Sequence, residues 1–209
     1  MNFWNEKIKF FSILNSGDSK YKFIYENFIR SLDNVGLSDV HENILVGGET
    51  GNYGTKKFKK IVHQRIPFVR DFLRKGYTVW NVDLDLVFLK DPTSYLFQYF
   101  EDYDLIAQKD KHKLCGGFYV AKPTPLVRKL FDNDCPSRMS EQNHMHKKLR
   151  EEEFQGLKIK FLDIDLFPYG EHWYKNNSSI KDPYIVHYNW IKGAEEKRNR
   201  MKKYGHWYL

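Results

Sequence analysis

The sequence predicts a single α/β domain whose first half holds a largely parallel sheet. Three observations predict it. Strand-like and helix-like segments alternate along the first half, the strands of the second half are shorter and more mixed, and 209 residues without repeat or linker suffice for one domain with a complete core. Disorder is excluded because 41% of residues are hydrophobic and 17% aromatic, although 29% are charged.

The first half alternates short apolar runs with longer segments of helical period. The run at residues 8–14 is followed by the turn Asn15-Ser16-Gly17 and predicts a buried strand. The last helical segment ends before Gly76, and its interior Pro67 should end a turn or kink the helix. The predicted strands of this half span residues 8–14, 44–46 and 77–80, and the predicted helices span 21–32 and 55–75.

The second half gives a less regular pattern. Asp91-Pro92 is a turn signal, and Pro123 and Pro125 open a helix. Apolar runs predict strands at 105–107, 114–120, 159–162 and 184–187, whereas helices are expected at 95–100, 126–131 and 141–153. The remaining residues form a basic, aromatic tail.

The net charge of +7 comes from two segments. Residues 56–75 have a net charge of +7 and residues 192–203 a net charge of +4, so the rest of the chain sums to −4. An excess of this kind attracts nucleic acid, an anionic membrane or a phosphate-bearing ligand.

The sequence contains few signals for membrane insertion, secretion or cysteine chemistry. No apolar run is long enough to span a membrane, and residues 1–10 lack the pattern of a signal peptide. Cys115 and Cys135 are too few for a disulfide framework or a four-ligand zinc site. We therefore expect a soluble, cytoplasmic protein, or one domain of a longer chain.

Two aspartates lie at the carboxyl end of a predicted strand. Asp83 and Asp85 follow residues 77–80, and alternation points both side chains to one side, where they could hold one Mg²⁺ or Mn²⁺ ion. A solvated loop is the alternative, which the apolar flanks weaken. His187 follows another β-branched run and is a third candidate ligand that would favour Mn²⁺. Its alternative is a core histidine bonded to backbone.

These residues, with others in the same order, resemble the nucleotide-diphospho-sugar transferase family of GT-A glycosyltransferases, a family with algal-virus and plant-wall members. The resemblance implies one GT-A domain over residues 1–209, with a mixed sheet flanked by helices, a nucleotide-binding half (1–90) and a donor-sugar and acceptor half (91–209). It rests on residues 83–92 (DLDLVFLKDP), 115–120 (CGGFYV), Glu141-Gln142, and His187-Tyr188-Asn189-Trp190 with Gly193 and Lys197.

The resemblance also implies a role for each of these positions. Asp83, Asp85 and His187 would hold Mn²⁺, with Mg²⁺ as the alternative, against a donor diphosphate. Relatives often have Lys where Arg65 stands and Asp where Glu141 stands, which leaves the contacts of these two open. The other implied groups are Asn15, Ser16 and Gly17 for nucleobase and ribose, Lys192, Gly193 and Lys197 for diphosphate, Arg65 for phosphate or base, Gly116, Gly117 and Gln142 for donor sugar, and Asp83, Asp85, Glu141 and Gln142 for catalysis.

The implied activity is transfer of a sugar from a nucleotide-diphosphate donor, UDP-linked, to a glycan or glycoprotein, with retention. His144 could orient donor hydroxyls or the acceptor, and Trp173, Trp190 and Trp207 are candidates for the acceptor site. Gly116-Gly117 would otherwise be a turn or bulge. The alternatives are a nucleic-acid-binding basic protein, which leaves the Asp-x-Asp unexplained, a metal-dependent phosphohydrolase, and an inactive, sugar-binding relative.

Overall fold

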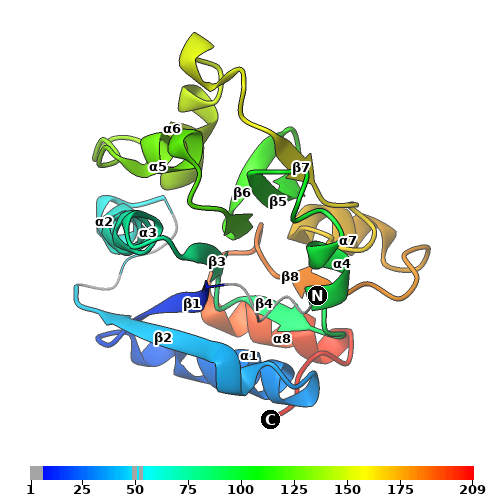
Figure 1. Cartoon of the computed structure of the whole chain (residues 1–209). Coiled ribbons are helices and arrows are strands. Elements are labelled where there is room, and N and C mark those ends of the chain that lie inside the picture. Colours follow the sequence, from blue (N-terminus) through cyan, green and yellow to red (C-terminus); the bar gives the residue numbers. More distant parts are fainter. Residues whose placement is uncertain (1–6, 49–50, 52–53) are drawn as a thin grey trace.

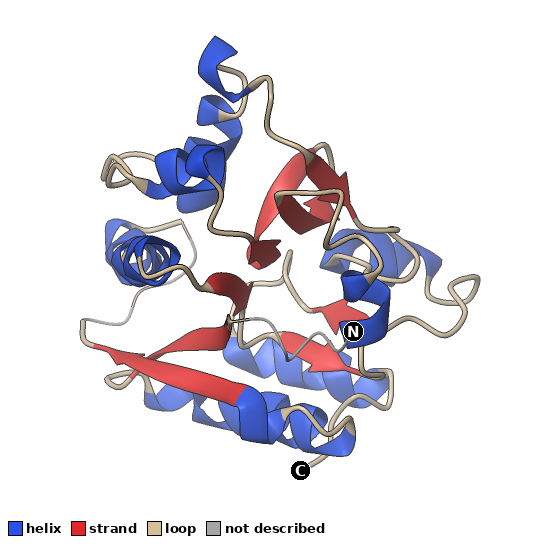
Figure 2. Cartoon of the chain, viewed as in Figure 1, coloured by secondary structure: helices blue, strands red, loops and turns tan. Residues whose placement is uncertain are grey.

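Six strands form a mixed sheet at the centre of a computed structural model that describes residues 7–48, 51 and 54–209 (Figures 1 and 2). The signal-peptide prediction therefore falls mostly outside the described residues. The strand order is β2-β1-β3-β6-β5-β7; β1 pairs in parallel with β2 and β3, whereas β6 runs antiparallel to β3 and β5. The strands are β1 (Ile8–Asn15), β2 (His41–Val46), β3 (Thr78–Val82), β5 (Leu105–Asp110), β6 (Lys113–Ala121) and β7 (Ile159–Phe161).

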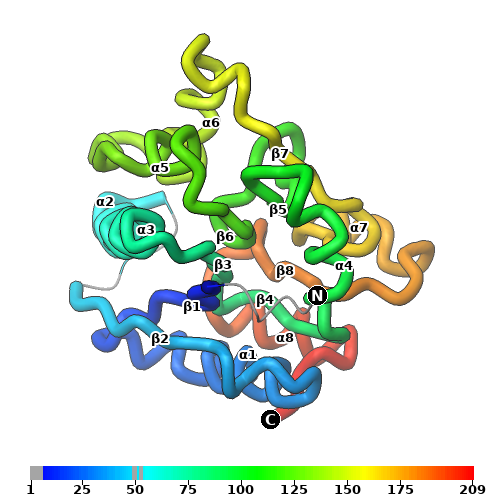
Figure 3. The backbone as a smooth tube through the Cα atoms, viewed as in Figure 1, coloured from blue at the N-terminus to red at the C-terminus, as the bar shows by residue number. Residues whose placement is uncertain are grey.

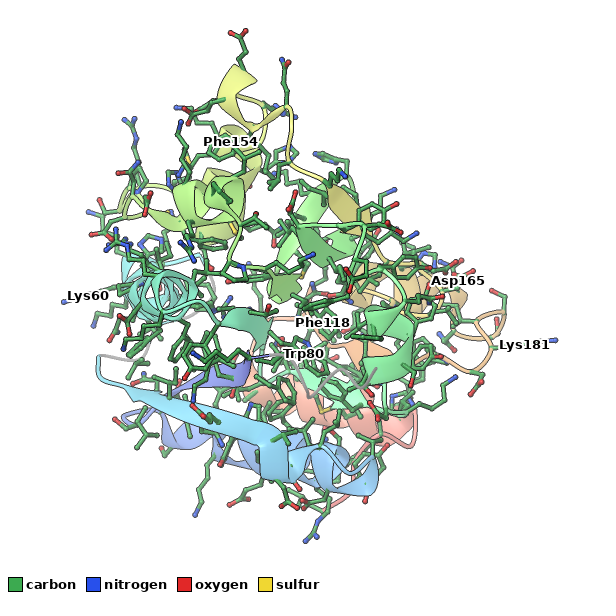
Figure 4. All side chains as sticks on the ribbon, viewed as in Figure 1. Lys60, Trp80, Phe118, Phe154, Asp165 and Lys181 are labelled. Atoms are coloured by element: carbon green, nitrogen blue, oxygen red, sulfur yellow. The ribbon has the colours of Figure 1, made fainter. Side chains whose placement is uncertain are left out.

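Helices cover both faces of this sheet, because alternate side chains along its strands point to opposite faces. Phe10 and Trp80 belong to the hydrophobic cluster that includes α1, whereas Phe11 and Val79 belong to the cluster that includes α3, α5 and α6. Trp80 lies edge-on to Phe118 with ring centroids 6.1 Å apart (Figure 4). The helices are α1 (Lys22–Asn34), α2 (Lys56–His63), α3 (Arg65–Arg74), α4 (Thr93–Phe97), α5 (Pro125–Phe131), α6 (Glu141–Lys148), α7 (Gly170–Asn176) and α8 (Ala194–Lys203), with 3₁₀ turns at Ser19–Tyr21, Ser38–Val40 and Glu152–Phe154.

A two-stranded antiparallel sheet joins distant parts of the chain. β4 (Leu86–Phe88) pairs with β8 (Ile185–His187), so that Leu86 lies opposite His187. The two strands lie side by side in the backbone trace (Figure 3). This pairing brings the end of the chain to the residues that follow β3.

The predicted order of strands and helices is confirmed, with local differences. The expected helix 55–75 is broken at Gln64 into α2 and α3, because Pro67 has no N–H to donate to the carbonyl of His63. The expected helix 141–153 ends at Lys148. Helices α7 and α8 were not predicted, and α8 lies within the expected tail.

No helix in the described ranges combines the length and the hydrophobicity that crossing a bilayer requires.

Candidate active site

A cavity of about 440 Å³ opens where β1 and β3 end. Its apolar side includes Ile13 on β1 and Phe58 and Ile61 on α2. Its polar side includes the aspartates after β3 and the segment from His187 to Lys197. Ligands of open α/β sheets bind at this edge.

Asp83, Asp85 and His187 converge in this cavity. Asp83 directly follows β3, and its backbone N–H donates to the carbonyl of Gly117 at 2.8 Å. His187 reaches Asp85 because β8 pairs with β4, and the N–H of Tyr188 donates to the carbonyl of Asp85 at 2.8 Å. One ligand atom from each of the three side chains lies within 4.8 Å of the others.

Gln108 on β5 orients the imidazole of His187. The amide nitrogen of Gln108 donates to the carbonyls of Phe167 and Pro168, at 3.1 Å each, which fixes the direction of its amide oxygen. That oxygen lies 2.8 Å from Nδ1 of His187 and accepts its proton. Nε2 is therefore the nitrogen that faces the carboxylates, 3.2 Å from Asp85 and 3.9 Å from Asp83.

The three side chains fit a divalent metal ion. Two carboxylates and one imidazole are a donor set suited to Mn²⁺, and the bond from Gln108 leaves Nε2 as the ligand atom. Gly117 leaves the space that the Asp83 and His187 side chains occupy, because a Cβ there would overlap the Asp83 carboxylate and lie 2.8 Å from Cε1 of His187. At Gly116 the atoms nearest to a Cβ belong to Gln142, at 3.5 Å or more.

Lys197 on α8 forms an ion pair with Asp85. Its ammonium also donates to the carbonyl of Tyr188 at 2.9 Å, and only 7% of the residue is exposed. Burial alone would raise the pKa of Asp85, but the charges of Lys197 and His187 hold that pKa far below its usual value. Burial likewise opposes the charged form of His187, yet Asp85 raises its pKa well above the ordinary value.

Gly193 starts α8 beside these groups. Its backbone φ of 87° lies in the left-handed region that glycine tolerates, and no side chain caps the helix there. The N-terminal end of α8 is therefore next to the cavity, which Lys192 and Gly193 line.

Arg65 lies behind the aspartates, at the start of α3. Its guanidinium pairs with Asp83 and donates to the carbonyl of Gly116, and it lies 3.4 Å from the Glu141 carboxylate. Glu141 is 3% exposed and does not line the cavity. Burial raises the pKa of Glu141 to about 7. The structure thus places Glu141 against Arg65, while the neighbouring Gln142 reaches the cavity.

The remaining predicted residues divide between the cavity and its surroundings. Asn15 lines the cavity, and Ser16 and Gly17 form the adjoining turn, where the N–H of Gly17 donates to the Asn15 side chain at 3.3 Å. His144, Trp173 and Trp207 are not in the lining. Trp173 is 7% exposed in the cluster around α7 and α8, with which Trp207 also packs, whereas Trp190 lines the cavity.

The sequence reasoning did not single out two residues that line the cavity and one that lies behind it. Asp110 and Tyr21 line the cavity directly, and Gln108 acts behind His187. Asp110 ends β5, so the rule that predicted Asp83, a carboxylate at a strand end, could have found it. Gln108 lies within the same strand, and nothing in its spacing marks it.

Known proteins resemble this chain in sequence and in fold. A family model described as nucleotide-diphospho-sugar transferase matches residues 33–201. The chain is 25% identical to a UDP-galactose:fucoside alpha-3-galactosyltransferase of Dictyostelium discoideum, with 94% of this chain and 34% of that protein covered. It is 26% identical to a UDP-D-xylose:L-fucose alpha-1,3-D-xylosyltransferase of Arabidopsis thaliana, with 75% and 51% covered. The chain thus spans about a third to a half of the length of these relatives.

A solved structure has the same fold. The crystal structure of a glycosyltransferase involved in glycosylation of the major capsid of PBCV-1 superposes with a TM-score of 0.59 at 13% identity, covering 92% of this chain and 99% of that chain. This likeness confirms the predicted GT-A fold. Because the family model covers most of the sequence, the chain belongs to the nucleotide-diphospho-sugar transferase family, which is a family of glycosyltransferases.

Proposed function

We propose that this chain transfers a sugar from a UDP-sugar to a glycan, with one divalent metal ion held by Asp83, Asp85 and His187. The observation that supports it most is the convergence of these three side chains beside Lys197 in one cavity. The names of two relatives give UDP-galactose and UDP-xylose as donors, which supports a UDP-sugar here.

The chain's own cations would bind the donor diphosphate. Lys197 would contact its oxygens together with Lys192 and the first N–H groups of α8, because helix N-termini and ammonium groups both attract phosphate. When bound, Mn²⁺ or Mg²⁺ supplies positive charge that stabilises the diphosphate as it leaves. Arg65 would keep the Asp83 carboxylate in place from behind.

The bond that breaks joins the sugar's anomeric carbon to a phosphate oxygen, and the bond that forms joins the same carbon to the hydroxyl oxygen of the acceptor. The proton of that hydroxyl passes to the leaving phosphate oxygen, and the cations neutralise the remaining charge of the diphosphate. Gln142 would contact the donor sugar, since its side chain lines the cavity and accepts the N–H of Gly116 at 3.1 Å. Retention of anomeric configuration is part of the proposal and rests on the family resemblance.

The acceptor is proposed to be a fucose-containing glycan, because the names of both relatives contain fucose or a fucoside as acceptor. A phosphohydrolase with two metal ions is less well supported. Such an enzyme needs ligands for two ions. Within the described ranges, Asp83, Asp85 and His187 are the one group of three or more His, Cys, Asp or Glu side chains close enough to hold an ion.

Calorimetry with nucleotide-sugars tests the proposal. We expect UDP-galactose or UDP-xylose to bind in the presence of Mn²⁺ and not after chelation, and Asp85→Ala to abolish this binding. Asp102→Ala is the matched control, because Asp102 is an exposed aspartate outside the cavity. Binding that needs no metal, or that survives Asp85→Ala, would contradict the proposed function.

A further inference from the structure

Trp190 places a half-exposed indole at the cavity. It is 53% exposed, yet its Nε1–H is used internally, because it donates to Oδ1 of Asp110 at 2.8 Å. An indole whose only polar atom is bonded within the protein presents an apolar ring in a fixed orientation.

The backbone at this place is strained. Lys111, Asp182 and Trp190 are the non-glycine residues with positive φ in the described part of the chain, and two of them touch. The ammonium of Lys111 lies 3.9 Å from the Trp190 ring centroid and 2.8 Å from the carboxylate of Glu171. Left-handed backbone is unfavourable for residues other than glycine and gathers at functional sites. The strain marks the contact between Lys111 and Trp190 as a candidate for function.

Asp110 has capacity for a ligand hydroxyl. Oδ1 accepts the indole N–H of Trp190, and Oδ2 accepts the side-chain amide of Gln142 at 3.1 Å. A carboxylate can accept about four hydrogen bonds, so each oxygen can take one more. Both present donors are neutral N–H groups, and the carboxylate lines the cavity.

These groups continue directly from the proposed donor-sugar contacts. Gly116 donates to Gln142, Gln142 donates to Asp110, and Trp190 donates to the other oxygen of Asp110. The segment next to the donor sugar is where the second sugar must lie for transfer to occur.

We propose that Trp190 and Asp110 form the acceptor site and that its ligand is an uncharged sugar. The apolar face of the sugar ring packs on the indole, and one ring hydroxyl donates to Asp110. The negative charge of Asp110 repels a phosphorylated or carboxylated acceptor. This inference rests on the proposed function, since the site is defined by its position beside the donor sugar.

The indole N–H signals in proton–nitrogen NMR spectra provide a direct test. The signal of Trp190 is the one that disappears in Trp190→Phe. In protein saturated with UDP and Mn²⁺, methyl α-L-fucopyranoside should shift this signal and leave that of Trp207 in place, because Trp207 packs on Phe23 outside the cavity lining.

Two variants then separate the contributions. Asp110→Asn keeps the size of the side chain and weakens fucoside binding by roughly tenfold, since the sugar hydroxyl then meets a neutral amide in place of a carboxylate. Trp190→Ala weakens it by about fivefold, and Trp207→Phe is the matched control without effect. Galactose 6-phosphate should bind wild type more weakly than methyl β-D-galactopyranoside.

The inference is overturned if the Trp190 signal does not move, if Asp110→Asn and Trp190→Ala bind the fucoside as wild type does, or if the phosphorylated sugar binds better. Failure of UDP to bind wild type with Mn²⁺ is a different result, and it contradicts the proposed function. In that case a titration with the glycoside in the absence of UDP still shows whether the indole N–H signal of Trp190 shifts.

Discussion

Replacing Lys197 by methionine should have opposite effects on metal and on diphosphate binding. The variant keeps the length of the side chain and removes the ammonium that Asp85 and the Tyr188 carbonyl share. Because this ion pair is buried, removal of one partner should lower the free energy of unfolding by about 3–5 kcal/mol in the presence of a chelator. His187 remains beside Asp85 and places the expected loss at the lower end of that range.

Metal affinity in the absence of nucleotide should rise in this variant. The ammonium of Lys197 is paired with the Asp85 carboxylate, which is a proposed ligand of the ion, so its positive charge lies beside the ion. A divalent ion about 5 Å from a unit charge is repelled by roughly 1.7 kcal/mol even at the dielectric constant of water, which is more than tenfold in affinity. Affinity for UDP should fall at the same time, whereas uridine, which has no diphosphate, should bind almost as before.

Isothermal titration calorimetry of Mn²⁺, then of UDP and uridine with Mn²⁺ present, measures all three effects. Urea unfolding with chelator, and again with Mn²⁺, measures stability and its recovery by the ion. Lys203→Met, an exposed position on the same helix, is the control. Weaker Mn²⁺ binding by Lys197→Met, or equal losses for UDP and uridine, would refute the reasoning.

Three further predictions concern the surroundings of the metal ligands. Gly117→Ala should abolish Mn²⁺ binding in calorimetry and lower the unfolding free energy by about 2 kcal/mol or more, since its Cβ overlaps the ligands, whereas Gly116→Ala should cost less than about 1 kcal/mol and retain the ion. Burial raises the pKa of Glu141 to about 7, so the stability that its protonated form contributes is complete below its unfolded pKa and is lost as pH rises through 7. That loss of unfolding free energy is about 3 kcal/mol and should be absent from urea unfolding curves of Glu141→Gln. If the stability of Glu141→Gln depends on pH as that of the wild type does, the prediction is contradicted. Gln108→Leu should weaken Mn²⁺ binding by about 10- to 100-fold, because Nδ1 of His187 loses the oxygen that accepts its proton, and unchanged binding would count against the role of Gln108.

The parts of the fold that depend on local pattern could be predicted from the sequence. The strand before Asp83 is a buried run that ends in two carboxylates, and its position at the sheet edge follows from strand alternation and from the edge at which such sheets bind ligands. The break near Pro67 likewise follows from a missing N–H group.

The rest depends on contacts between distant segments. Strand β8 has three residues, and the sequence does not state that it pairs with β4. Helix α8 buries only Ala194, Lys197 and Met201, a stripe too sparse to stand out among its charged residues. The position of Glu141 against Arg65 depends on how α6 and α3 pack, so its side chain could be assigned to the cavity as easily as to the interior.

Because β4 pairs with β8, the proposed metal site joins two segments that are far apart in the sequence. Asp85 and His187 are 102 positions apart, and Asp85 and Lys197 are 112 apart. An ion bound there would fasten the C-terminal segment to the body of the protein and oppose its local detachment. Amide hydrogen exchange in β8 and α8 should therefore slow when Mn²⁺ is added, while exchange in α5, which lies on the other face of the sheet, should change little. During synthesis the site can form only after the helix that carries Lys197 has been made and has docked.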